Sequence, residues 1–186
     1  MKNLLLSSVI LLFLLNSATC QDFENLFERL NTFDAFEQYD EVDLEILEAS
    51  NYLLTVPIQR SNYSKEFYFA LKSLAKWCNH TNGYKILIFG KVIESCGDDA
   101  LMKNMYMAAM AKYLINEKYN NGRHVFPEKQ PDINFGDLPE VKETLLEGAK
   151  IFFEYLANTA NERPNKGLRN GIKAYEEGTL TSYMFE

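Results

Sequence analysis

The stretch GDDALMKNMYMAAMAKYLINEKYNNG, residues 97–122, contains both the boundary signals and the periodicity of a long helix. Gly97-Asp98-Asp99 is typical of a helix start, and Asn120-Asn121-Gly122 is typical of a helix end. Between these signals, apolar side chains recur every three or four residues, namely Leu101, Met105, Ala108 and Ile115. The stretch therefore predicts an amphipathic helix with one buried face.

The same spacing recurs on both sides of this stretch. It predicts helices over residues 22–33, 42–53, 64–77 and about 140–160, and a short closing helix over 168–175. Asp22 and Ser64 are suitable N-caps, and the D-x-x-E spacing from Asp137 to Glu140 resembles a capping box. The fold class that we predict is all-α, a single-domain bundle of five to seven amphipathic helices with one disulfide.

Residues 123–137 form the main interruption of this helical pattern. They contain two prolines and no sustained period, which predicts a long loop. Loops of this length are uncommon in compact domains unless they have a function.

The first twenty residues have the pattern of a secretory signal peptide. Lys2 precedes an apolar and small-residue run from Leu4 to Leu15, and Ala18 and Cys20 suit a signal peptidase. This run is shorter than the roughly 20 residues needed to span a bilayer, and no later stretch is a candidate span. We predict cleavage before Gln21 and a secreted, extracellular domain over residues 21–186.

Cleavage at Gln21 leaves two cysteines, Cys78 and Cys96. In an oxidising compartment such a pair predicts a disulfide, which would contribute about 3 kcal/mol to stability. The alternative is two buried free thiols. If the bond forms, a tight helical hairpin is excluded, because a returning helix over residues 84–95 would place Cys96 about 18 Å from Cys78.

Residues 84–95 therefore have two interpretations. In the preferred one, residues 79–83 run outward in extended form and a helix returns towards Cys78. In the other, Gly90 turns a short β-hairpin.

This region carries a resemblance to a known family. Residues 74–96 contain L-A-K-W-C, Gly83, an I-x-x-F pattern at Ile86 to Phe89, and E-S-C at Glu94 to Cys96. In these features the segment resembles the cysteine-bounded helical segment of the insect haemolymph glycoprotein family. The resemblance implies an all-helical, secreted and cysteine-rich protein.

Two sequons and one group of apolar residues are the candidate sites. Asn62 and Asn79 each begin an N-x-[ST] sequon, which predicts glycosylation in a secreted chain. Four residues of the predicted helices are candidates to line an apolar ligand pocket, because methionine and aromatic side chains suit such pockets: Met102, Met105, Tyr106 and Phe152.

Catalytic patterns are scarce in the sequence. Two histidines are too few for a three-histidine zinc site, and no nucleophile, phosphate-binding or metalloprotease motif is present. We therefore predict no catalytic residues, no metal and no cofactor. The alternative is a secreted hydrolase that uses dispersed carboxylates such as Glu94, Asp98 and Asp99.

Charge is distributed unevenly along the chain. Residues 21–60 contain ten acids against Arg29 and Arg60, whereas acids and bases balance from Ser61 onward. Such a segment suits a basic partner, cations or a solvated helix surface, and it makes nucleic acid an improbable partner. The predicted function is that of a secreted, non-catalytic glycoprotein of the haemolymph, saliva or venom type, which binds a protein partner or a small apolar ligand.

Overall fold

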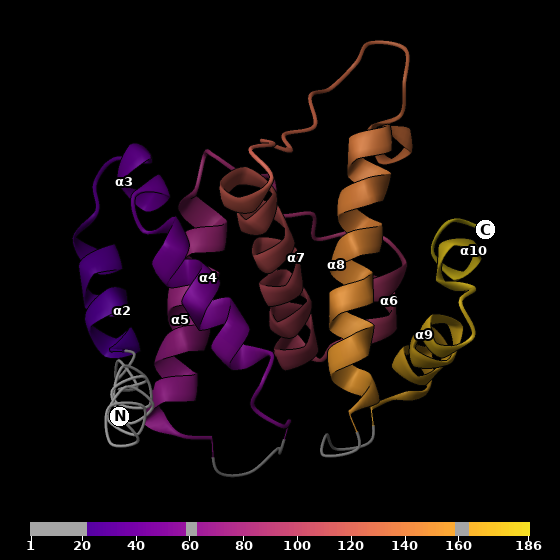
Figure 1. Ribbon diagram of the computed structural model, residues 1–186, viewed down its shortest axis with the longest axis horizontal. Coiled ribbons are helices and arrows are strands. Elements are labelled where there is room, and N and C mark those ends of the chain that lie inside the picture. The colour runs from indigo at the N-terminus through magenta and orange to yellow at the C-terminus, as the bar shows by residue number, and fades with distance from the viewer. Residues whose placement is uncertain (1–21, 59–62, 159–163) are drawn as a thin grey trace, which may run out of the picture.

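A computed structural model describes residues 22–58, 63–158 and 164–186 (Figure 1). The predicted signal peptide and Asn62 lie outside these residues. The described residues are all-helical and contain no strand, which confirms the all-α part of the predicted fold class.

The helices follow one another along the chain, joined by connections of different lengths. The α-helices are α2 (Phe23–Thr32), α3 (Glu37–Asp40), α4 (Asp43–Leu53), α5 (Lys65–His80), α6 (Lys91–Cys96), α7 (Ala100–Asn120), α8 (Pro139–Ala157), α9 (Lys166–Glu176) and α10 (Leu180–Phe185), and η1 (Phe135–Asp137) is a 3-10 turn. Of the connections that the structure describes in full, the two longest are residues 81–90, which we call the connector, and residues 121–138, which we call the long loop.

The described residues form nine α-helices, more than the five to seven predicted. Two of the additional helices are α3, with four residues, and α10, with six. Elements of so few residues are too short to display a helical period in the sequence, and they form because the chain around them is packed.

The predicted N-caps Asp22 and Ser64 are confirmed by hydrogen bonds, and Asp99, in the predicted start signal of α7, caps its helix in the same way. The side chains of Asp22, Ser64 and Asp99 accept hydrogen bonds from the third residue after each of them, and these residues begin α2, α5 and α7. The capping box predicted at Asp137 is wrong. Helix α8 begins instead with Pro139, whose fixed φ suits the first position of a helix, and its N-cap residue Leu138 makes no side-chain cap.

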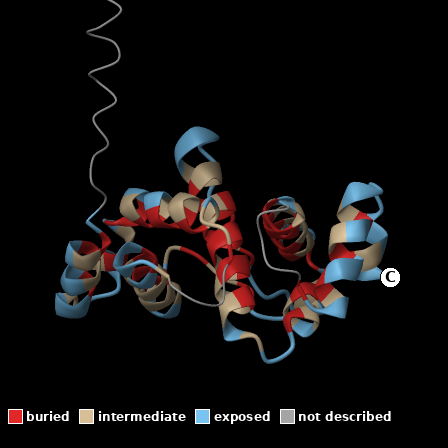
Figure 2. Ribbon diagram, turned by 90° about the horizontal axis from the view of Figure 1, so that it is seen from below, coloured by how far each residue is buried: buried red, intermediate tan, exposed pale blue. Residues whose placement is uncertain are grey.

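Helix α7 lies in the middle of the molecule (Figures 1 and 2). It packs on α4 and α5 on one side and on α8 and α6 on the other. It is therefore buried on more than the single face that the sequence predicts, and its buried residues are Met102, Met105, Tyr106, Ala108, Ala109, Met110, Ala111, Tyr113, Leu114 and Ile115. A helix enclosed by neighbours gains from apolar residues around most of its circumference.

Two glycines allow helices to approach closely. A Cβ on Gly148 of α8 would lie 2.6 Å from Cγ of Met110 on α7, and a Cβ on Gly171 of α9 would collide with the ring of Phe153 on α8.

The predicted disulfide is absent, because Cys78 and Cys96 are free cysteines. Cys78 lies in the last turns of α5, and Cys96 is the last residue of α6, which packs on α7, α9 and α10 rather than on α5. The connector is irregular over residues 81–89 and does not return towards Cys78 as a helix or a hairpin. At Gly90, which has φ 86°, it turns into α6.

Candidate functional site

The connector and the long loop lie against each other at one end of the bundle. This is the end at which α5 and α7 finish and α8 starts, and the long loop projects beyond the helices there (Figure 1). The Gly83 carbonyl accepts a hydrogen bond from Nε2 of His124, and the rings of Phe89 and Phe135 have centroids 6.2 Å apart. Two irregular segments distant in sequence thus form one surface.

Lys85 joins the two segments at the centre of this surface. Its Nζ donates a 2.6 Å hydrogen bond to the carbonyl of Pro127. The same ammonium lies 4.4 Å from the ring centroid of Phe126 and 5.8 Å from that of Phe135. A cation is attracted to the face of an aromatic ring, so Lys85 holds both aromatic residues of the long loop against the connector.

A buried carboxylate fixes the start of the connector. Asp43, the first residue of α4, is fully buried, and its Oδ2 accepts hydrogen bonds from Tyr84 Oη at 2.6 Å, Lys118 Nζ at 2.8 Å and Tyr119 Oη at 3.3 Å. Its other oxygen, Oδ1, is buried and makes no hydrogen bond with the described residues. This Asp43 centre connects α4, the connector and α7.

The protonation states of these groups follow from their surroundings. Burial, followed by the hydrogen bond to Asp43, raises the pKa of Tyr84 far above its ordinary value, so the phenol remains a donor. Burial acts to lower the pKa of Lys118, but the hydrogen bond and the charge of Asp43 outweigh it, and the pKa of this ammonium is raised. The Lys118 ammonium therefore remains protonated throughout the neutral range.

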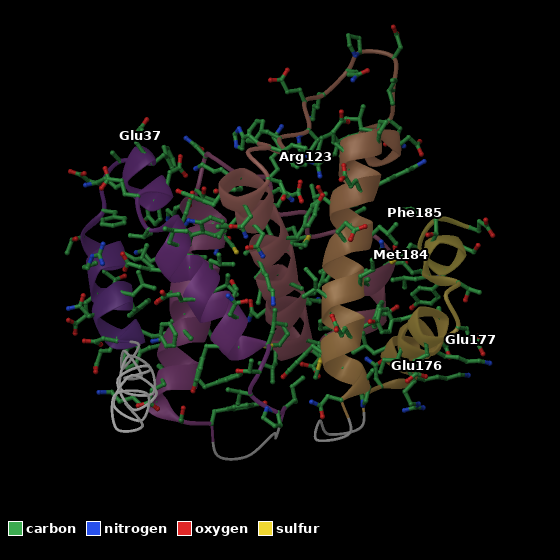
Figure 3. All side chains as sticks on the ribbon, viewed as in Figure 1. Glu37, Arg123, Glu176, Glu177, Met184 and Phe185 are labelled. Atoms are coloured by element: carbon green, nitrogen blue, oxygen red, sulfur yellow. The ribbon has the colours of Figure 1, made fainter. Side chains whose placement is uncertain are left out.

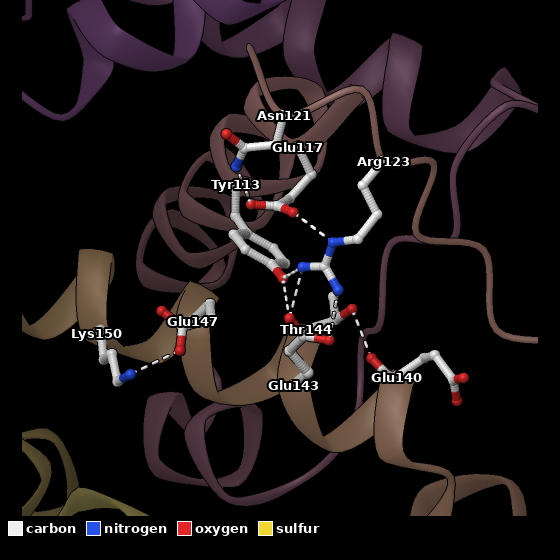
Figure 4. Close-up of polar contacts among 9 residues, drawn as sticks. All are labelled: Tyr113, Glu117, Asn121, Arg123, Glu140, Glu143, Thr144, Glu147 and Lys150. Atoms are coloured by element: carbon white, nitrogen blue, oxygen red, sulfur yellow. Dashed lines mark hydrogen bonds and ion pairs between the residues drawn. The ribbon is translucent and has the colours of Figure 1, made fainter. Parts of the chain in front are cut away.

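A second polar cluster fixes the start of the long loop (Figure 4). Arg123 donates from Nε to Glu117 of α7 at 2.6 Å and from Nη1 and Nη2 to Glu143 of α8 at 2.9 and 2.6 Å. Tyr113 donates to the same Glu143 carboxylate at 2.9 Å. A two-pronged guanidinium–carboxylate contact fixes orientation as well as distance, so Arg123 fastens the loop to both helices.

The electrostatics of this Arg123 cluster reinforce its geometry. The hydrogen bond from Arg123 is the largest influence on Glu143 and holds the pKa of that carboxyl below its ordinary value. The hydrogen bonds to Glu143 and Glu117 raise the pKa of Arg123 in return. Opposite charges at hydrogen-bond distance stabilise each other's ionised form.

Between these anchors the two segments expose apolar side chains to solvent. Ile88, Phe89 and Ile133 are 65%, 38% and 44% exposed, and Phe126 and Phe135 are partly buried. We call the set Lys85, Ile88, Phe89, Phe126, Ile133 and Phe135 the loop-end surface. Five of these six side chains are apolar, so the surface offers mainly apolar contact around the single charge of Lys85.

The four candidate pocket residues do meet in space, as packed core residues between α7 and α8. Met102, Met105, Tyr106 and Phe152 are all buried. The ring centroids of Tyr106 and Phe152 are 5.6 Å apart, and the Tyr106 hydroxyl donates to the carbonyl of Leu145 at 3.1 Å. These four side chains therefore fill the core, and the hydroxyl of Tyr106 already has a hydrogen-bond partner.

The carboxylates of the hydrolase alternative are divided between two grooves. Asp98 and Asp99 line a groove with Asn165, whereas Glu94 lines a separate groove with Lys91 and Tyr183. Asp99 also serves as the N-cap of α7. The structure thus does not bring the three carboxylates together.

Of the two predicted glycosylation sites, Asn79 lies within the described residues. Its side chain is exposed in the last turn of α5 and donates to the carbonyl of Ala75 at 2.8 Å. The hydroxyl of Thr81, the third residue of the sequon, donates to Asp40 at 3.0 Å. Asn79 is therefore accessible, but its sequon hydroxyl has a partner in the folded chain.

The sequence predicts the long loop and indicates a function for it, but it does not distinguish the connector as part of a surface. The signal for the loop is that the apolar residues between positions 125 and 135 do not recur with a helical period. For the Asp43 centre there was no signal, because Asp43 is one of many acids in its segment and its partners come from residues 84, 118 and 119.

None of the helices in the described part of the chain is both long and apolar enough to cross a bilayer. Comparisons of the chain with models of protein families, with curated proteins and with solved structures found no match. The resemblance of residues 74–96 to the insect haemolymph glycoprotein family therefore stays a prediction, and the function must be argued from the chain itself.

Proposed function

We propose that the protein is a secreted, non-catalytic helical glycoprotein that acts by binding a protein partner through the loop-end surface. The observation that carries this proposal is the exposure of Ile88, Phe89 and Ile133 on two irregular segments that polar anchors hold in place. Apolar side chains exposed together on functional loops are typical of interaction sites.

The anchors support binding because they reduce its entropic cost. A free loop must be ordered when a partner docks, and this ordering opposes association. Here Arg123 fastens the beginning of the long loop to α7 and α8, and Lys85 fastens its middle to the connector. The loop-end surface is thus preorganised before a partner arrives.

The two alternatives have weaker support. A small apolar ligand would need a cavity, but the residues offered for one, such as Tyr106 and Phe152, pack against each other. The hydrolase alternative relies on three carboxylates, but Glu94 lies in a different groove from Asp98 and Asp99, and Asp99 already serves as the N-cap of α7.

Native mass spectrometry of the protein purified from its natural fluid distinguishes a protein partner from a small apolar ligand. A second protein at a fixed ratio supports the proposal, whereas a lipid-sized ligand at unit ratio or hydrolytic turnover by the isolated chain contradicts it. N-terminal sequencing of the same material tests secretion, because cleavage of the leader exposes Gln21 as the first residue.

The surface itself is tested by rebinding of the co-purified partner. The variant Ile88→Ser/Phe89→Ser should lose about tenfold or more in affinity, since apolar anchors at the centre of an interface dominate its binding energy. The matched control is Tyr68→Ser, which removes a side chain that is 50% exposed on α5. Equal affinity of the two variants for the partner would contradict the assignment.

Glycosylation is tested separately from binding. Treatment with an N-glycosidase should lower the mass of the secreted protein, and Asn79→Gln and Asn62→Gln then show which sequon carries a glycan. Because the Thr81 hydroxyl is bonded to Asp40 in the folded chain, we expect Asn79 to be modified before folding, while the sequon is extended.

A further inference from the structure

A second surface lies on α3 and the first half of α4, away from the C-terminal helices α9 and α10 (Figure 1). Residues 34–48, which we call the acidic lobe, comprise α3 and most of α4 (Figure 1). They contain seven acidic residues and no lysine or arginine. The lobe therefore has a strongly negative potential, in a chain whose charges balance from Ser61 onward.

Part of this charge is used inside the protein and part is not. Asp43 and Glu45 pair with Lys118 and Arg29, and Asp40 accepts a hydrogen bond from Thr81. The other four acids are exposed and make no ion pair with the described residues: Asp34, Glu37, Glu41 and Glu48. These four carboxylates are available to an external cation.

Large apolar side chains stand among these free acids. Phe36, directly before α3, is 52% exposed, and Leu44, the second residue of α4, is 53% exposed. The acidic lobe thus combines two kinds of contact, since carboxylates attract a basic group and the two apolar side chains can be covered by another apolar surface.

The acidic lobe is held rigidly on the bundle. Tyr39, the buried residue of α3, stacks on His80 with ring centroids 5.2 Å apart, and its carbonyl accepts a 3.0 Å hydrogen bond from Nε1 of the buried Trp77. Its hydroxyl donates to the carbonyl of Leu30. A partner would therefore meet a surface that is already ordered, which favours affinity.

We infer that the acidic lobe is a docking surface for a basic protein segment in which lysine or arginine alternates with apolar residues. The charge of the partner follows from the seven acids, and its apolar residues follow from Phe36 and Leu44. The lobe shares no residue with the loop-end surface, and the inference makes no use of the proposed function.

The inference is tested with two labelled peptides, an amphipathic lysine–leucine peptide and an oligolysine of the same charge. Fluorescence anisotropy should show that the lysine–leucine peptide binds more tightly, with an affinity that falls as salt is added. The variant Glu37→Gln/Glu41→Gln should weaken its binding roughly fivefold, and Phe36→Ser/Leu44→Ser by a similar factor.

The matched control is Glu176→Gln/Glu177→Gln, which removes the same charge at the opposite end of the molecule (Figure 3). If this control weakens binding as much as Glu37→Gln/Glu41→Gln does, only net charge matters and the inference is overturned. The inference is also overturned if the peptide does not bind, if both peptides bind equally, or if Phe36→Ser/Leu44→Ser has no effect. Circular dichroism confirms that each variant is folded.

Discussion

Nζ of Lys118 lies 2.8 Å from Oδ2 of Asp43, and the two residues differ sharply in exposure. The carboxylate is fully buried, whereas the side chain of Lys118 is 34% exposed. The ammonium therefore compensates a charge that water does not reach, while keeping part of its own hydration.

Removal of Lys118 should leave this buried charge without its cation. We expect Lys118→Met to lower the free energy of unfolding by about 2 kcal/mol, less than for a fully buried pair because Lys118 is partly solvated. Urea denaturation followed by circular dichroism measures the change. Lys112→Met on the same helix is the control, because Lys112 makes no ion pair with the described residues, and an equal loss in both variants would contradict the role of Asp43.

The Arg123 cluster should make stability depend on pH. Because Arg123 holds the pKa of Glu143 below its ordinary value of 4.5, the folded protein favours the ionised carboxylate more than the unfolded chain does. This stabilisation is present above the unfolded pKa and is lost as the pH falls through the folded pKa.

The measurement compares urea denaturation of the wild type and Glu143→Gln from neutral pH downward. The wild type should be more stable at neutral pH, and the difference should shrink below about pH 4. Glu154→Gln, an exposed position of the same helix, should show no such convergence. A difference that stays constant with pH would show that the Glu143 charge contributes nothing.

Both cysteines should be present as slowly reacting thiols. Burial raises the pKa of Cys96 to about 12 and raises that of Cys78 further, so little thiolate exists near neutral pH. An aromatic disulfide reagent should modify Cys78 and Cys96 slowly in the folded protein and rapidly in urea. A peptide containing Cys78 joined to Cys96 in a non-reducing digest would refute the free thiols.

The close approach of Gly171 to Phe153 should make position 171 intolerant of any side chain. Alanine normally stabilises a helix relative to glycine, but here its Cβ would collide with a buried aromatic ring. We expect Gly171→Ala to destabilise the protein by about 1–3 kcal/mol. The double variant Gly171→Ala/Phe153→Leu should regain part of the loss relative to the sum of the single variants, and strict additivity would contradict the contact.

The sequence predicts local structure well because local chemistry determines it. Asp22 and Ser64 cap helices as expected, since the capping hydrogen bond spans three residues. The same reasoning failed at Asp137, where Pro139 suits the first helical position and moves the helix start.

Contacts that depend on the path of the chain could not be predicted from the sequence. A disulfide between Cys78 and Cys96 was expected from cysteine number and compartment, but their separation depends on where the connector leads. The Asp43 centre and the Lys85–Pro127 contact likewise join residues about 40 or more positions apart. Periodicity carries no information on such pairings.

Helix α7 is the element shared by the two halves of the molecule, since α4 and α5 pack on one side of it and α6 and α8 on the other. Each half needs α7 to bury its apolar side chains. Unfolding of one half would therefore also destabilise the other. Amide hydrogens in the middle of α7 should consequently exchange with deuterated solvent only when the entire chain opens at once.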